Sequence, residues 1–304
     1  MTYSIVARDP ETGHMGVAAQ SQAFAVGSSV PWALPGFGVV ATQSMGEPMY
    51  GELGLGALRS GLTAAEALTA LRSVDPHPER RQVAMVDSYG GIDVYTGEAC
   101  VAAAGHARGD GCAALANLMA TDGVWDAMVG AYEATGGPLE VRLLAALQAA
   151  EAEGGDLRGR RSVAMLVVRA ERSGRPWQDQ LVDLRVDDHP EPLEELQRML
   201  QYAWRYRRTA EAFELALDGH GDEALDRLGQ AAFDPDTDVE VEPELVLWRA
   251  IALGAADRVD EARSLLADFD RIAPAFVESA RRFGPARLVD PGLLERLLPP
   301  TAGR

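Results

Sequence analysis

The chain has 304 residues, and its 46 acidic side chains outnumber its 28 basic ones, which gives a formal net charge of −18. This acidity argues against nucleic acid and anionic membranes as partners, because both require local positive charge on the protein. Every basic side chain is an arginine, so lysine chemistry is excluded, including Schiff bases, phosphate-loop lysines and serine–lysine dyads.

Three strands are predicted near the N-terminus. They cover residues 2–8, 13–21 and 38–44, which are rich in small and β-branched side chains. Two helical patterns follow. The first, about residues 48–60, includes a glycine-rich run that lacks the strand–turn–helix context of a nucleotide-binding loop. The second begins at Thr63, where Glu66 three positions on completes a capping-box signature.

A mixture of strands and helices continues to about residue 190. The sequence predicts a hairpin of residues 82–87 and 92–96. Helices follow over residues 110–152, with a break at 136–138, and then two strands at residues 161–169 and 181–186. This order is typical of a layered α+β fold, in which helices cover the outer faces of sheets.

The remainder of the chain shows helical patterns only. They cover residues 193–218, 222–232, 244–255 and 259–271. An acidic, proline-containing connection is expected at residues 234–243. Ala224 and Ala262 lie in two similar helix starts that are 262 − 224 = 38 residues apart. This spacing fits the ~34-residue period of helix-pair repeats with a small insertion, although a small helical bundle also accounts for it. We therefore expect two domains, 1–195 and 196–304.

Thr2 follows Met1 directly at the start of the first predicted strand. An aminopeptidase readily removes Met before a small residue, which would leave the α-amine of Thr2 beside its own hydroxyl. An α-amine has a pKa of about 8, so it can act as the base that activates this hydroxyl. One residue would then supply both nucleophile and base.

Five segments together resemble a known family. They are residues 2–13, residues 25–33, Ala41-Thr42-Gln43 with Tyr50-Gly51, Gly154-Gly155-Asp156-Leu157-Arg158-Gly159, and residues 183–190. Their order and spacing are similar to those of an uncharacterised bacterial family in the N-terminal-nucleophile (Ntn) hydrolase superfamily, over about residues 2–200. The remainder resembles a helical extension of some members that is described as peptidoglycan-binding.

The resemblance implies a four-layer αββα sandwich, with two packed antiparallel sheets and helices outside, followed by a small all-α domain. Members of the superfamily mostly cleave amide bonds with an N-terminal Thr, Ser or Cys and need no cofactor. This chain departs from its relatives at Gln22, where Lys is frequent, at Glu47 (Asn), at Ala116-Asn117 (Gly-Asn) and at Arg161 (Gln). The missing lysine argues against a mechanism in which a lysine lowers the pKa of the nucleophile.

Four catalytic residues are predicted: Thr2 as nucleophile, Ser21, Asn117 and Asp156. Ser21 ends a strand that would approach the N-terminus. Asn117, expected near a helix start, is the candidate donor to an oxyanion. Asp156 could hold the α-ammonium or orient Arg158. The structural alternatives are a strand cap for Ser21, an ordinary helix residue for Asn117 and a structural clamp for Asp156.

Gln43, Arg158 and Arg161 are the predicted substrate-binding residues. Gln43 lies at a strand end, and the two arginines belong to a positive cluster that would fit a carboxylate-bearing substrate; a solvated surface explains the cluster equally well. Asp187, Asp188 and His189 cannot converge on a metal if they continue a strand, because adjacent strand residues point to opposite faces. No metal or cofactor site is predicted.

The leading interpretation is a cytoplasmic Ntn-type amidohydrolase that acts on a small-molecule amide. The cytoplasm is expected because neither a ~20-residue apolar run nor a signal peptide is present. Cys100 and Cys112 form no disulfide framework and are expected to be small buried residues. A non-catalytic ligand- or partner-binding protein on the same fold is the alternative, and a cell-wall amide hydrolase is a third. A homodimer through a sheet edge or the helical domain is a further expectation.

Overall fold

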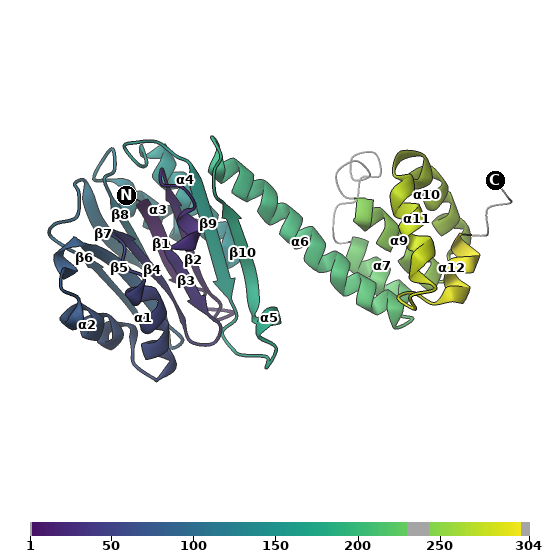
Figure 1. The fold of residues 1–304 in the computed structure, drawn as a ribbon, viewed down its shortest axis with the longest axis horizontal. Helices are drawn as coiled ribbons and strands as arrows, with labels where there is room; N and C mark the ends of the chain where they lie inside the picture. The colour runs from purple at the N-terminus through teal and green to yellow at the C-terminus, as the bar shows by residue number, and fades with distance from the viewer. Residues whose placement is uncertain (1, 230–242, 299–304) are drawn as a thin grey trace. The chain divides into compact units, whose positions relative to one another are not determined.

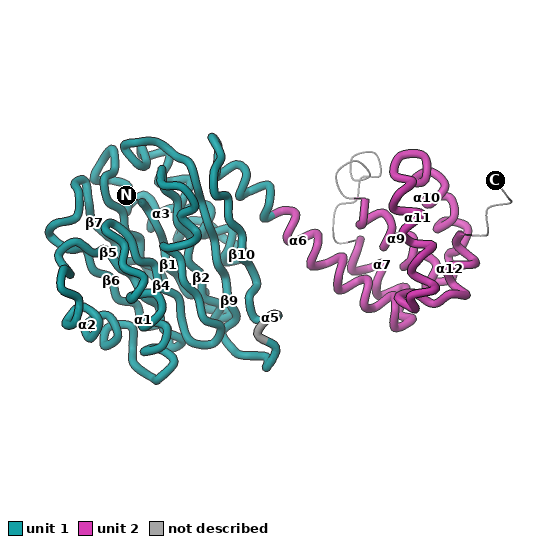
Figure 2. Tube along the Cα trace, in the orientation of Figure 1, with its two compact units in different colours: residues 1–200 teal, residues 201–304 magenta. Residues whose placement is uncertain are grey.

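The computed structural model describes residues 2–229 and 243–298. The chain divides into two compact units, residues 1–200 and 201–304 (Figure 2). Helix α6 (Pro192–Leu217) begins in the first unit and ends in the second. The first unit contains all the strands that the structure describes.

Two antiparallel sheets form the centre of the first unit. The larger has the strand order β10 (Gln180–Val186), β9 (Ser162–Val168), β2 (Met15–Ser21), β1 (Thr2–Arg8), β8 (Cys112–Asn117) and β7 (Ala104–Gly109). The smaller has the order β3 (Pro31–Leu34), β4 (Gly38–Ser44), β5 (Arg81–Asp87) and β6 (Ile92–Thr96). β1 therefore lies in the interior of its sheet, between β2 and β8.

The sheets pack face to face, with helices on their outer sides (Figure 1). Val6, Val17 and Leu115 of the larger sheet share one buried apolar cluster with Val39 and Val86 of the smaller sheet. Helices α1 (Met49–Arg59) and α2 (Ala64–Val74) cover the smaller sheet, and α3 (Val124–Ala134) and α4 (Leu139–Ala152) cover the larger. Short helices η1 (Val26–Ser28), η2 (Pro78–Arg80) and α5 (Pro176–Asp179) complete this unit. The observed fold is mixed α+β with two antiparallel sheets.

Most predicted elements of this unit are confirmed, but one prediction was wrong and two strands were missed. Residues 110–152 were expected to be helical apart from a break at 136–138, whereas Cys112–Asn117 is strand β8, paired with β1 on one side and β7 on the other. β8 is buried on both faces, so its run of alanines lacks the alternation that marks a half-buried strand. The strands Pro31–Leu34 and Ala104–Gly109 were missed. Both lie at the edge of a sheet, and the first begins with a proline.

The predicted capping box at the start of α2 is confirmed. The Thr63 hydroxyl accepts a hydrogen bond from the Glu66 N–H (3.3 Å), and the Glu66 carboxylate accepts one from the Thr63 N–H (2.9 Å). We expect Thr63→Ala to lower the free energy of unfolding by about 1 kcal/mol, because a backbone donor loses its partner. The measurement is urea unfolding, with Thr69→Ala on the exposed face of the same helix as the control. An equal loss in both variants would contradict the capping role.

The second unit consists of helices in the residues that the structure describes. After α6 come α7 (Gly221–Gly229), α9 (Pro243–Ala255), α10 (Val259–Ile272), α11 (Pro274–Phe283) and α12 (Pro291–Leu297), of which the last two were not predicted. Ala224 and Ala262 are both fully buried in its core. Residues 234–242 of the predicted connection lie outside the described residues. Among the described helices of the whole chain, none combines the length and apolar composition that crossing a membrane requires.

Candidate functional site

Polar side chains occupy one end of the space between the two sheets. Seven residues form this polar row: Ser162, Ser21, Thr2 and Asn117, opposite one another across the larger sheet, and Gln43, Gln82 and Thr96, opposite one another across the smaller sheet. Further along the same strand faces, the side chains belong to the apolar core. Each strand therefore changes from an apolar to a polar interior at the end where Thr2 begins the chain's first strand.

Thr2 is buried, with 4% of its surface exposed. Its hydroxyl donates a hydrogen bond to Ser21 Oγ (3.2 Å), which also accepts one from the N–H of Ala23 (3.0 Å). The structure thus brings together two of the predicted catalytic residues, and the Thr2 hydroxyl is held by an oxygen that the backbone anchors.

Gln43 connects the two sheets at this point. Its Nε2 lies within hydrogen-bonding distance of the main-chain carbonyls of Thr2 (3.0 Å) and Leu115 (3.1 Å) and of Gln82 Oε1 (2.7 Å). The Ser4 hydroxyl donates to the Gln43 Oε1 atom. Carbonyl oxygens only accept hydrogen bonds, so this environment fixes which side of the amide carries the nitrogen. Gln43 was predicted to bind substrate; here its amide group binds the main-chain carbonyl of Thr2.

Gln82 lies beside Gln43 and is fully buried. Its Nε2 donates to the carbonyls of Ala116 (2.8 Å) and Gly105 (3.0 Å), which orients its amide by the same argument. Gln82 Oε1 is consequently an acceptor, and it receives hydrogen bonds from Gln43 and from Asn117 Nδ2 (2.9 Å).

Asn117 is fully buried and lies directly across from Thr2. It is the last residue of β8, not a residue near a helix start as expected. Its Nδ2 donates to Gln82 Oε1 at 2.9 Å and lies 3.4 Å from the carbonyl oxygen of Thr2. Its Oδ1 has no hydrogen-bond partner among the residues that the structure describes. Both Nδ2 hydrogens of Asn117 thus have acceptors nearby. Its Oδ1 atom remains as an acceptor without a partner beside Thr2.

Asp156 lies in the loop between α4 and β9, with 4% of its surface exposed. Its carboxylate accepts hydrogen bonds from the Gln22 N–H (3.3 Å) and from the Arg158 N–H (3.0 Å) and guanidinium (2.8 Å). The bond to Asp156 raises the pKa of Arg158. Asp156 thus forms an ion-pair clamp with Arg158, as the sequence suggested. Its hydrogen bond with the Gln22 N–H connects it to the residue that follows Ser21.

Arg161 has a side chain engaged elsewhere. Its guanidinium pairs with Asp188 (2.9 Å) and lies 5.4 Å from the centre of the Phe24 ring, while its N–H donates to the carbonyl of Ser21 (3.1 Å). The hydrogen bond from Arg161 lowers the pKa of Asp188. Arg161 therefore contributes to the Ser21 strand end through its backbone.

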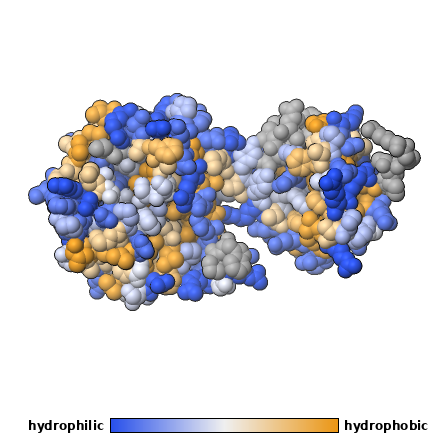
Figure 3. All heavy atoms as spheres, viewed as in Figure 1, coloured by the Kyte–Doolittle hydropathy of each residue, from blue (hydrophilic) through white to orange (hydrophobic). Residues whose placement is uncertain are grey.

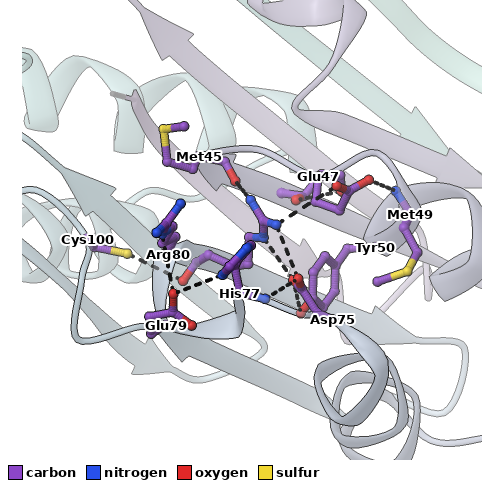
Figure 4. A network of polar contacts seen from close by, with 11 residues as sticks. Met45, Glu47, Met49, Tyr50, Asp75, His77, Glu79, Arg80 and Cys100 are labelled. Carbon is purple, nitrogen blue, oxygen red and sulfur yellow. Dashed lines mark hydrogen bonds and ion pairs between the residues drawn. The ribbon is translucent and has the colours of Figure 1, made fainter.

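A buried ion pair holds the loop that follows β4 (Figure 4). Arg81, next to Gln82, donates to Asp75 (2.8 Å) and to the carbonyl of Met45 (2.7 Å). The Tyr50 hydroxyl also donates to Asp75 (3.0 Å). The bond from Arg81 is the largest factor that lowers the pKa of Asp75, to about 2. This network fixes the chain immediately beyond Gln43.

The sequence patterns did not point to Gln82 or Ser4 as parts of this site. A signal for Gln82 was present, because it stands in phase with Ala84 and Val86 on the inward face of a predicted strand. A glutamine at such a position needs buried partners. Those partners lie on the other sheet, which the alternation of one strand does not identify.

Potential metal ligands and the two cysteines are scattered among the described residues. No group of three or more His, Cys, Asp or Glu side chains gathers there as a metal site would require. Cys100 and Cys112 are both free, Cys100 is only half-buried, and burial raises the pKa of the Cys112 thiol to about 12.

The model of a family of unknown function, DUF1028, matches residues 2–196. The chain belongs to the DUF1028 family. The crystal structure of protein SPO2555 from Silicibacter pomeroyi, which is assigned to the same family, is similar to this DUF1028 chain. The two are 34% identical with a TM-score of 0.60, over 66% of this chain and 85% of that one. Comparison with curated proteins found no match.

Proposed function

We propose that this DUF1028 protein is an Ntn-type amidohydrolase in which Thr2, after removal of Met1, attacks a small amide. The observation that carries the proposal is the setting of Thr2. It begins an interior strand, and its hydroxyl is hydrogen-bonded to Ser21 at the polar end of the inter-sheet space. The layer order of helices, two antiparallel sheets and helices supports the assignment of an Ntn-like sandwich.

The proposed reaction uses the two functional groups of Thr2. The α-amine takes the hydroxyl proton as Oγ1 bonds to the substrate carbonyl carbon. The C–N bond then breaks, the leaving amine receives the proton, and an acyl ester of Thr2 remains. A water molecule hydrolyses this ester, which releases the carboxylic acid and restores the hydroxyl.

Asn117 takes a different role in this proposal from the one predicted. A free α-amine carries N–H donors, and the unpartnered Oδ1 of Asn117 is a buried acceptor on the residue paired with Thr2 across the sheet. To donate to an oxyanion, Asn117 Nδ2 would have to lose its 3.4 Å contact with the carbonyl oxygen of Thr2. We therefore assign Asn117 to the amine and Gln43 and Gln82 to its positioning, with Asp156 and Arg158 as a clamp on the Gln22 segment.

A non-catalytic binding role on the same fold is the second candidate. The low exposure of Thr2 favours it, because a nucleophile must be reached by its substrate. The two candidates differ in what they require of the amino terminus, since only the enzyme needs a free Thr2 amine.

The state of the amino terminus therefore tests the proposal. We expect the intact mass of the untagged full-length protein to lack Met1, and Edman sequencing to begin at Thr2. Full retention of Met1, or acetylation of Thr2, would contradict the single-residue mechanism in the isolated protein and favour the binding role.

A further inference from the structure

Exposed apolar side chains gather on the loops around the polar row. Phe24 is 63% exposed, Val101 43% and Leu157 64%. Phe24 lies three residues beyond Ser21, Val101 precedes β7, and Leu157 precedes β9, all at the strand ends that carry the row. Figure 3 shows hydrophobic surface on the first unit near the position where Figure 1 marks the N-terminus.

The loops that carry Val101 and Leu157 are joined through Leu118, the residue directly after Asn117. The N–H of Leu118 donates to the carbonyl of Val101 (2.9 Å), and the carbonyl of Leu118 accepts from the N–H of Leu157 (3.1 Å). Leu118 has a φ of 56°, a left-handed conformation that is uncommon for a branched residue. We refer to Val101, Leu118 and Leu157 as the apolar wall, since backbone hydrogen bonds hold them side by side next to the site.

The charges at this end are neutralised in pairs. Arg158 pairs with the buried Asp156 at 2.8 Å, and Arg161 pairs with Asp188 at 2.9 Å. The arginine cluster that suggested a carboxylate-bearing substrate is therefore already matched by carboxylates of this chain. An uncharged substrate suits this environment better than an anionic one, because it displaces none of these ion pairs.

We propose that the Thr2 site takes amides whose acyl group is an uncharged aliphatic chain, which lies against the apolar wall. This inference rests on the proposed amidohydrolase function and names its substrate class. Burial of one methylene favours binding about fourfold. A chain of four extra methylenes that is only partly covered by the wall should therefore be preferred about tenfold or more.

The test compares hexanoyl and acetyl p-nitroanilides as substrates of the full-length protein. We expect kcat/KM to be at least about tenfold higher for the hexanoyl compound. Leu157→Ser should remove most of this preference, because it should lower kcat/KM for the hexanoyl compound far more than for the acetyl compound. Tyr89→Ser is the matched control, because Tyr89 is 82% exposed on the β5–β6 turn, at the other end of β5 from Gln82. Equal cleavage of the two substrates, or a preference that Leu157→Ser does not alter, would overturn the inference.

A binding measurement separates this inference from the function on which it rests. Isothermal titration of the Thr2→Ala protein with hexanamide and acetamide requires no catalysis. We expect hexanamide to bind more tightly, and Leu157→Ser to remove the difference. Such binding without cleavage of any amide would contradict the enzyme but support the apolar wall. Thr2-dependent cleavage without any chain-length effect would support the enzyme and refute the wall.

Discussion

Thr2→Ala is expected to abolish amide hydrolysis while the fold persists. The variant keeps the α-amine and the strand but loses the only atom proposed to attack the carbonyl. Loss of the nucleophile should lower kcat by about 10³-fold or more, because only binding and electrostatic contributions remain. The lost hydrogen bond to Ser21 should cost about 1 kcal/mol of unfolding free energy, which a folded protein tolerates. Rates on an amide library and urea unfolding of both proteins provide the measurement.

Thr12→Ala is the control for this substitution. Thr12 lies in the β1–β2 turn, at the other end of β1 from Thr2, where its hydroxyl accepts a hydrogen bond from the His14 N–H (3.2 Å). We expect full activity from this variant. If Thr2→Ala cleaved amides at the wild-type rate, either another group would attack the substrate or the cleavage would come from a contaminant.

The strand ends at this site followed from local patterns. Runs of small and β-branched residues placed Ser21 and Gln43 at the ends of predicted strands, and both lie in the polar row. The resemblance to Ntn hydrolases placed those ends near Thr2. Local sequence carries this information because strand boundaries depend mainly on nearby residues.

The hydrogen-bond roles at the site could not be derived in the same way. The orientation of Asn117 depends on Gln82, whose own orientation depends on the carbonyls of Gly105 and Ala116. These atoms come from both sheets, and they meet only when the sheets pack. Asn117 was identified as a candidate but placed near a helix start, since the doubly buried, alanine-rich strand of residues 112–117 lacks the period-two signal.

Asp75→Asn is expected to destabilise the first unit by about 3 kcal/mol at neutral pH. Asp75 and Arg81 have side chains only 1% and 11% exposed, so the substitution leaves the guanidinium without its carboxylate in a buried position. The Tyr50 hydroxyl also loses a charged acceptor. Urea unfolding of the full-length protein, followed by tryptophan fluorescence, provides the measurement. Asp93→Asn is the control, because Asp93 pairs with Arg108 at the surface, where an ion pair contributes about 1 kcal/mol or less.

The pH dependence of the difference in unfolding free energy between wild type and Asp75→Asn tests whether the charge of Asp75 causes it. The pKa of Asp75 falls from an ordinary 3.8 to about 2 on folding, so the unfolded chain binds a proton first as the pH is lowered. The contribution of Asp75 to stability is therefore complete above about pH 4 and is lost as the pH falls toward 2. Since one pKa unit corresponds to about 1.4 kcal/mol, the gap between wild type and Asp75→Asn should shrink by about 2 kcal/mol over this range. A gap that stays constant from pH 4 to pH 2 would mean that the shape and hydrogen bonds of Asp75, and not its charge, hold the loop beyond Gln43.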